Sequence, residues 1–222
     1  TPHSCYTMSQ ELNRRVAAEG LKNGYISYHS EESREENDMV RYGTGALADD
    51  YNSRGTTTLP VFGVSSRIYF IENLKKAITL PIDANVLLVH NVDTSSESIQ
   101  AAKKAFRRSF WVLCPLSNIF IHNALPPVNL LRENGLTICI GTDSLSSNDQ
   151  LCMVDELRCI QENYPEIPLS ELLTWATYNG AVAIGKDSIY GSFDIGKRPG
   201  VVLIENIVDG KLTKESISRR LI

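Results

Sequence analysis

The chain has 222 residues, of which 42% are hydrophobic and 22% charged, a composition ordinary for a globular protein with one sizeable core or two small ones. Its formal net charge of −4 argues against a nucleic acid or an anionic membrane as partner, because both favour a basic face. No apolar run approaches the roughly 18 residues that span a bilayer, and we expect no signal peptide. The 5 scattered cysteines form no Cys-x-x-Cys pair, which predicts reduced thiols and a cytoplasmic location.

The first 66 residues combine segments with the pattern of a helix or a strand and a glycine-rich segment without one. Capping residues predict a helix over 9–21, with Gly24 just past its end. The β-rich run 25–29 predicts a short strand, and the acidic run 31–36 predicts a solvated helix start, where acids suit the helix dipole. Several glycines over 43–66 predict either a functional lid or a disordered segment.

From residue 66 onward, strands and helices alternate. The apolar spacing predicts strands over 86–90, 110–114 and 137–141, and helices over 66–79, 95–108, 126–133, 148–163 and 169–183. Together with the strand over 25–29, this rhythm predicts an α/β fold with four parallel strands. The tail differs, because a turn-rich hairpin over 191–200 and a strand over 201–204 predict a small antiparallel β piece.

Polar residues stand where three of the predicted parallel strands end. His29 and His90 are the last residues of two strands, and Asp143 closes a third. Such ends share one edge of a parallel sheet, where ligands usually bind, and imidazole and carboxylate suit Zn²⁺ or Fe²⁺. A single histidine there is more often structural, and Asp143 alone could equally cap the next helix. Glu32 would lie beside the metal as a proton shuttle, unless it belongs to the solvated acidic run.

Several segments carry recognisable motifs in a fixed order. They are Thr1-Pro2-His3-Ser4-Cys5-Tyr6, His29-Ser30-Glu31-Glu32-Ser33, Leu88-Val89-His90-Asn91, Cys114-Pro115-Leu116-Ser117-Asn118, Gly141-Thr142-Asp143-Ser144 with Ser147-Asn148, the segment 177–181 and the tail 191–199. In this order the chain resembles the amidohydrolase superfamily, most closely its branch of chlorohydrolases and adenosyl- or guanine-type deaminases.

The resemblance implies a metal-dependent hydrolase that acts on a C–N bond of a small nitrogen-rich substrate through an activated metal-bound water. Hydrolysis of an amide or of a C–Cl bond is the alternative within the same class. The implied roles are metal ligand for His29 and Asp143, proton shuttle for Glu32, activation of the bound water for His90, and substrate binding for His3, Asn118, Ser147 and Asn148. The last three are expected to fix loops at the mouth of the site rather than to do chemistry.

One part of the family pattern is missing, because the metal site of the family also uses a His-x-His pair and this sequence has none. We therefore expect the C-terminal half of a TIM-like (β/α)8 barrel, with a partial barrel over 1–190 and a segment of an accessory β-sandwich over 191–222. Such a chain would need the missing N-terminal half or self-association, would bind Zn or Fe weakly or not at all, and would be inactive alone. The alternative from another class is a non-catalytic half-barrel scaffold or assembly subunit.

Overall fold

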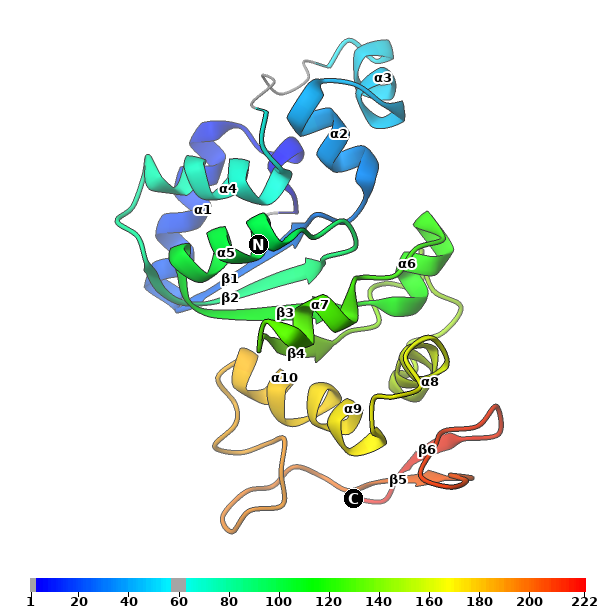
Figure 1. The fold of residues 1–222 in the computed structure, drawn as a ribbon. Helices are drawn as coiled ribbons and strands as arrows, with labels where there is room; N and C mark the ends of the chain where they lie inside the picture. Colours follow the sequence, from blue (N-terminus) through cyan, green and yellow to red (C-terminus); the bar gives the residue numbers. More distant parts are fainter. Residues whose placement is uncertain (1–2, 57–62) are drawn as a thin grey trace. The chain divides into compact units, whose positions relative to one another are not determined.

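The computed structural model describes residues 3–56 and 63–222, which form an α/β fold (Figure 1). A four-stranded sheet has the order β1-β2-β3-β4, and a second sheet pairs β5 with β6. The strands are β1 Tyr25–Ser30, β2 Ile82–His90, β3 Phe106–Leu113, β4 Thr137–Ile140, β5 Val202–Glu205 and β6 Ile217–Arg220. The predicted class, with four strands separated by helices, is confirmed.

The chain divides into two compact units, Thr1–Trp111 and Val112–Ile222. In the first unit, β1 and β2 are parallel, with Ser30 opposite His90. The helices of this unit are the short 3-10 helix η1 Cys5–Thr7, α1 Gln10–Asn23, α2 Arg34–Tyr42, α3 Ala46–Ser53, α4 Ser66–Lys75 and α5 Ser96–Ala105. Because parallel strands end at the same edge of the sheet, the pairing places the two predicted strand-end histidines side by side.

Local signals set most boundaries in the first unit. The Ser9 hydroxyl accepts a hydrogen bond from the Leu12 N–H, and Gly24 ends α1 in the left-handed conformation with φ of 80°, both as predicted. The segment 43–66 was predicted as a functional lid or a disordered segment. It contains α3, so disorder is wrong for Ala46–Ser53, while the lid stays a prediction and 57–62 lie outside the described residues. Helix α5 ends at Ala105, earlier than predicted, because β3 begins at the next residue.

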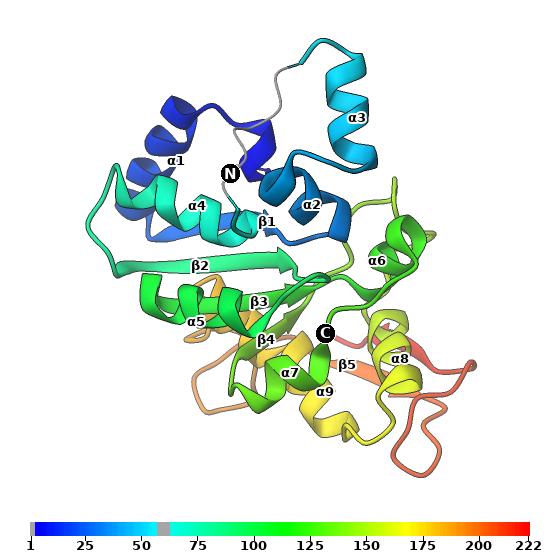
Figure 2. The ribbon, with the colours of Figure 1, turned by 45° about the horizontal axis from the view of Figure 1, so that its top comes forward.

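The core of the first unit forms where α1 packs against β1, β2 and α4. Both ribbon views show α1 and α4 on the same side of these two strands (Figures 1 and 2). Tyr28 of β1 is fully buried, and its ring stacks on Phe70 of α4 with centroids 3.7 Å apart. Burial of these large side chains stabilises the unit, at about 25 cal/mol for each Å² of apolar surface removed from water.

The second unit contains α6 Pro115–His122, α7 Val128–Glu133, α8 Met153–Asn163, α9 Leu169–Ala176 and α10 Tyr178–Ala183. Helix α6 was not predicted, since Pro115 indicated the end of a strand, whereas the proline occupies the first helical turn, where its missing N–H costs nothing. The predicted helix 169–183 is broken at Thr177, whose φ of −126° and ψ of −81° are not helical. Helices α9 and α10 pack against β4.

The tail forms the predicted small β piece, in which β5 and β6 pair antiparallel with Val202 opposite Arg220. The predicted division at residue 190 stays a prediction. No helix in the described ranges is long and apolar enough to cross a membrane.

All five cysteines are free thiols, and four of them are buried: Cys5, Cys114, Cys139 and Cys159. Burial raises the pKa of Cys139 and Cys159 to about 12 and that of Cys5 well above its ordinary value.

Candidate active site

Three histidines gather at the carboxyl ends of β1 and β2 in the first unit. The imidazole of His3 stacks on that of His29, with ring centroids 4.1 Å apart and planes 10° apart. The ring of His90 lies 5.0 Å from that of His29. The His29 N–H donates to the His3 carbonyl oxygen over 2.7 Å, which fixes the segment before η1 beside β1. The structure thus brings together three of the side chains that the sequence analysis selected.

Glu32 belongs to the same cluster. Its Oε1 lies 3.5 Å from Nε2 of His90, and the side chains are 15% and 1% exposed. A carboxylate and an imidazole that meet in a largely dry setting can exchange a proton with each other and with a bound molecule. The structure therefore places these two candidate side chains next to each other.

The acidic run around Glu32 is only partly solvated, because Glu35 is exposed while two of its other acids are buried. Glu31 and Glu36 are 0% and 1% exposed. The Glu36 carboxylate accepts hydrogen bonds from the backbone N–H groups of Glu31, at 3.2 Å, and Glu32, at 2.8 Å. Burial raises the pKa of Glu36 to about 7, because the charged form loses its hydration. The run therefore folds back on itself and holds the backbone that carries Glu32.

The strand exits adopt a backbone conformation that side chains rarely take. Glu31, His90 and Asn91 have φ angles of 51°, 76° and 63°. Each such residue outside glycine costs of order 1–3 kcal/mol, so its surroundings must hold it there. Here the surroundings are a buried polar network.

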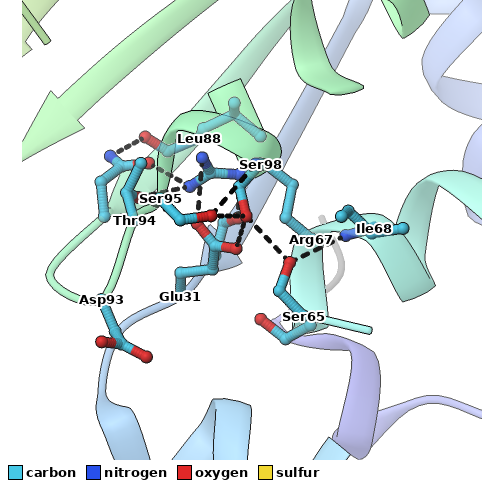
Figure 3. Close-up of polar contacts among 12 residues, drawn as sticks. Glu31, Ser65, Arg67, Ile68, Leu88, Asp93, Thr94, Ser95 and Ser98 are labelled. Atoms are coloured by element: carbon cyan, nitrogen blue, oxygen red, sulfur yellow. Dashed lines mark hydrogen bonds and ion pairs between the residues drawn. The ribbon is translucent and has the colours of Figure 1, made fainter. Parts of the chain in front are cut away.

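The centre of this network is Arg67 of α4, which is fully buried (Figure 3). Its Nη1 lies 3.0 Å from Oε2 of Glu31, and its Nε donates to the Ser30 hydroxyl over 2.9 Å. Its Nη2 donates to Oδ1 of Asn91 over 2.7 Å and to the Thr94 hydroxyl over 3.1 Å. One guanidinium therefore contacts the exits of both strands.

A second layer of hydroxyl groups completes the network (Figure 3). The Glu31 carboxylate accepts hydrogen bonds from the hydroxyls of Thr94 and Ser98. Ser98 also contacts Ser65, the residue that caps α4, over 2.9 Å. The sequence analysis missed this network, although Arg67 within the apolar spacing of its helix was a local signal for a buried charge.

The second unit contains the candidate carboxylate Asp143, which follows β4 with a left-handed φ of 56°. Its Oδ2 accepts hydrogen bonds from the hydroxyls of Ser117, at 2.7 Å, and Ser147, at 3.0 Å. The next helix, α8, is preceded by Cys152, so the alternative in which Asp143 caps that helix is wrong. The two hydroxyls hold the same carboxylate oxygen, Oδ2, and so orient the carboxylate.

Buried Glu156 of α8 fastens the segment around Asp143. Its Oε2 accepts from the Leu116 N–H over 2.9 Å, and its Oε1 accepts from the Asn148 side chain over 2.7 Å. Asn148 also donates to the Thr142 carbonyl oxygen over 3.0 Å. Burial raises the pKa of Glu156 to about 7. The contacts of Asn148 are those of a residue that fixes a loop, while fully buried Asn118 lies within α6, and its predicted role stays a prediction.

The predicted ligands His29 and Asp143 offer donor atoms of the right type for zinc or iron. Among residues 3–56 and 63–222, however, no group of three His, Cys, Asp or Glu side chains is placed to hold a metal ion. Catalytic zinc usually takes three protein ligands. These residues therefore do not by themselves fit a complete catalytic metal site.

Comparisons with known proteins agree with the order of the motifs. A model of the amidohydrolase family matches residues 1–218. The 5-methylthioadenosine/S-adenosylhomocysteine deaminase of Moorella thermoacetica is 30% identical over 215 residues, which cover 92% of this chain and 44% of that protein. The aminodeoxyfutalosine deaminase of a Nitratiruptor species is 30% identical over 208 residues, which cover 91% and 47%.

A solved deaminase structure is also similar to this chain over most of its length. Helicobacter pylori aminofutalosine deaminase in complex with methylthio-coformycin has a TM-score of 0.75 and 25% identity, and the match covers 99% of this chain and 56% of that chain. The chain spans less than half the length of the two deaminases compared by sequence.

Proposed function

Because the chain belongs to the amidohydrolase family, we propose that the protein containing it is a hydrolytic deaminase of adenosine-like nucleosides. Water would replace the exocyclic amino group of the adenine ring with oxygen, and ammonia would leave. The names of the relatives that cover most of the chain support this substrate class. The observation that carries the proposal is the 3.5 Å contact between Glu32 and His90 beside His29, at positions that match the motifs of the family.

In this proposal, the residues of the chain move the protons. Glu32 takes a proton from the attacking water and delivers it to the amino nitrogen that leaves. His90, held against Glu32, hydrogen-bonds the attacking oxygen and keeps it aimed at the ring carbon. His3 contacts the substrate, and Asn118, Ser147 and Asn148 shape the loops around it. A divalent metal, Zn²⁺ or Fe²⁺, bound in part by His29 and Asp143, would acidify the water.

The proposal extends to the architecture. The chain would be the C-terminal half of a (β/α)8 barrel, with 191–222 contributed to an accessory β-sandwich. Two facts support this view: four strands alternate with helices, and the chain spans less than half of each deaminase compared by sequence. On this view the remaining ligands lie outside the chain, so the chain alone lacks activity and binds metal weakly.

The test compares the full gene product with the 222-residue chain, using ammonia release from adenosine, 5′-methylthioadenosine and S-adenosylhomocysteine. We expect turnover by the full product only, and a loss of about 10²–10⁴-fold in kcat for Glu32→Gln. Glu35→Gln is the matched control, because Glu35 is an exposed acid three residues further along. Full activity of Glu32→Gln would contradict the proposed role, and a full product that releases ammonia from none of the three nucleosides would favour the scaffold alternative.

A further inference from the structure

We propose that Arg67 is a positioning residue of this site, which ties the exit of β1 to the exit of β2 and so fixes His29 and Glu32 relative to His90. The inference rests on the proposed function. Arg67 is 0% exposed and acts through its neighbours, so it does not touch substrate.

The contacts of Arg67 fall on the immediate neighbours of the candidate residues. Its Nε holds Ser30, which follows His29 in the chain. Its Nη1 pairs with Glu31, which precedes Glu32, while its Nη2 holds Asn91, which follows His90. Each of the three side chains on which the proposed chemistry depends is therefore one peptide bond away from a group bound by the same guanidinium.

The guanidinium is suited to this task because its donors lie in one rigid plane. One of its faces is covered too, since its central carbon lies 4.4 Å from the centre of the Trp111 ring. A lysine would place one flexible point charge in the same space and could not hold three partners in a fixed relation. The arrangement thus specifies arginine by geometry as well as by charge.

The backbone at the strand exits explains why such a clamp is needed. Glu31, His90 and Asn91 are all left-handed, and relaxation of any of them to an extended conformation would turn the adjacent side chain away. Asn91 is held on both sides, because its amide donates to the Leu88 carbonyl oxygen over 2.8 Å while its oxygen accepts from Arg67. Loss of the guanidinium would release the oxygen and with it the turn that follows β2.

A purely structural role makes a different prediction. Removal of one partner of a buried ion pair is strongly destabilising, but replacement of both partners by uncharged groups of similar volume is often neutral or stabilising. Stability should therefore return in Arg67→Met/Glu31→Gln. The positioning of the histidines should not return, because the contacts with Ser30 and Asn91 remain absent.

The experiment measures kcat and KM for ammonia release in the full gene product, with Arg67→Lys, Arg67→Met and Arg67→Met/Glu31→Gln. The imidazole ¹⁵N–¹H spectra of His29 and His90 are recorded in parallel, with His122 of the second unit as reference. Arg54→Met is the matched control, because Arg54 is exposed and its side chain pairs with Asp50, a residue of the adjacent helix α3.

We expect kcat to fall about 10–100-fold in Arg67→Met, with little change in KM. In Arg67→Lys, kcat should fall by less than in Arg67→Met. The double variant should regain thermal stability but not kcat, and the signals of His29 and His90 should shift while that of His122 does not. Return of kcat together with stability, or unchanged signals of His29 and His90, would overturn the proposal. If Arg67→Met does not fold, Arg67→Lys and Arg67→Met/Glu31→Gln test the proposal through the same changes in kcat and in the signals of His29 and His90.

Failure of the proposed function is distinguishable from failure of this inference. If the wild-type product releases no ammonia, the proposed function fails, while the imidazole spectra still decide whether Arg67 fixes the two strand exits. If the wild type is active and the Arg67 variants match it in kcat and in both signals, only the inference fails.

Discussion

The buried carboxyl of Glu36 predicts a specific pH dependence of stability. Its pKa is raised from 4.5 to about 7 by burial, so the native state holds a proton that the unfolded state has released. The stability that the protonated form contributes is complete below about pH 4.5 and is lost as the pH rises to about 7. From pH 5 to pH 8, this one group should lower the free energy of unfolding by about 2–3 kcal/mol. Because Glu36 is 1% exposed, solvent screening does not reduce this figure.

Glu36→Gln removes the titration while it keeps one oxygen to accept a hydrogen bond from the backbone of Glu31 or Glu32. The variant should therefore lose the pH dependence that Glu36 contributes, and the difference in unfolding free energy between wild type and variant should change by about 2–3 kcal/mol from pH 5 to pH 8. Urea unfolding of each protein, followed by the fluorescence of buried Trp111 in a Trp175→Phe background, measures this difference. Glu19→Gln, a change on the exposed face of α1, is the control and should keep the wild-type dependence. An identical pH dependence in Glu36→Gln and wild type would refute the reasoning.

Three further substitutions test the packing and the hydrogen bonds. Gly20→Ala should destabilise the protein by about 1–3 kcal/mol in urea unfolding, because the added methyl would lie 2.9 Å from the Tyr25 carbonyl oxygen; an unchanged midpoint would contradict this close approach. Ser33→Ala removes the hydroxyl that caps α2 and should cost about 1 kcal/mol in the same assay. Under the proposed role of Asp143 as a metal ligand, Ser117→Ala removes a hydroxyl that orients this carboxylate and should weaken divalent-metal binding by the full gene product about 10–100-fold, as measured by competition with a chelator.

Features that depend on neighbours in the chain could be predicted from the sequence. Ser9 and Gly24 delimit α1 through contacts within four residues. The residue types at these two positions were therefore enough to predict where the helix begins and ends. The carboxyl ends of β1 and β2 were also predictable to within one residue, because the apolar pattern stops near them: β1 ends at Ser30, one residue past the predicted His29, and β2 ends at His90 as predicted.

Features that depend on distant partners could not be predicted in this way. The run 31–36 has the composition of a solvated helix start, but Glu31 is buried against Arg67, which is separated from the neighbouring Ser30 by 37 positions. Glu156 lies 40 positions beyond Leu116, whose N–H it binds. A local pattern gives the type of such a residue but not its partner, so a buried carboxylate and an exposed one look alike until the fold brings the partner close.

The positions of the cysteines allow the local unfolding of each of the two units to be followed separately. Cys5 is the only cysteine of the first unit, whereas Cys114, Cys139 and Cys159 are buried in the second. A buried thiol with a raised pKa reacts with an alkylating reagent only after its surroundings have opened. Alkylation of one of these cysteines therefore shows that the unit containing it has opened. A brief exposure to reagent followed by peptide mass analysis would therefore resolve the unfolding of the two units without any engineered label.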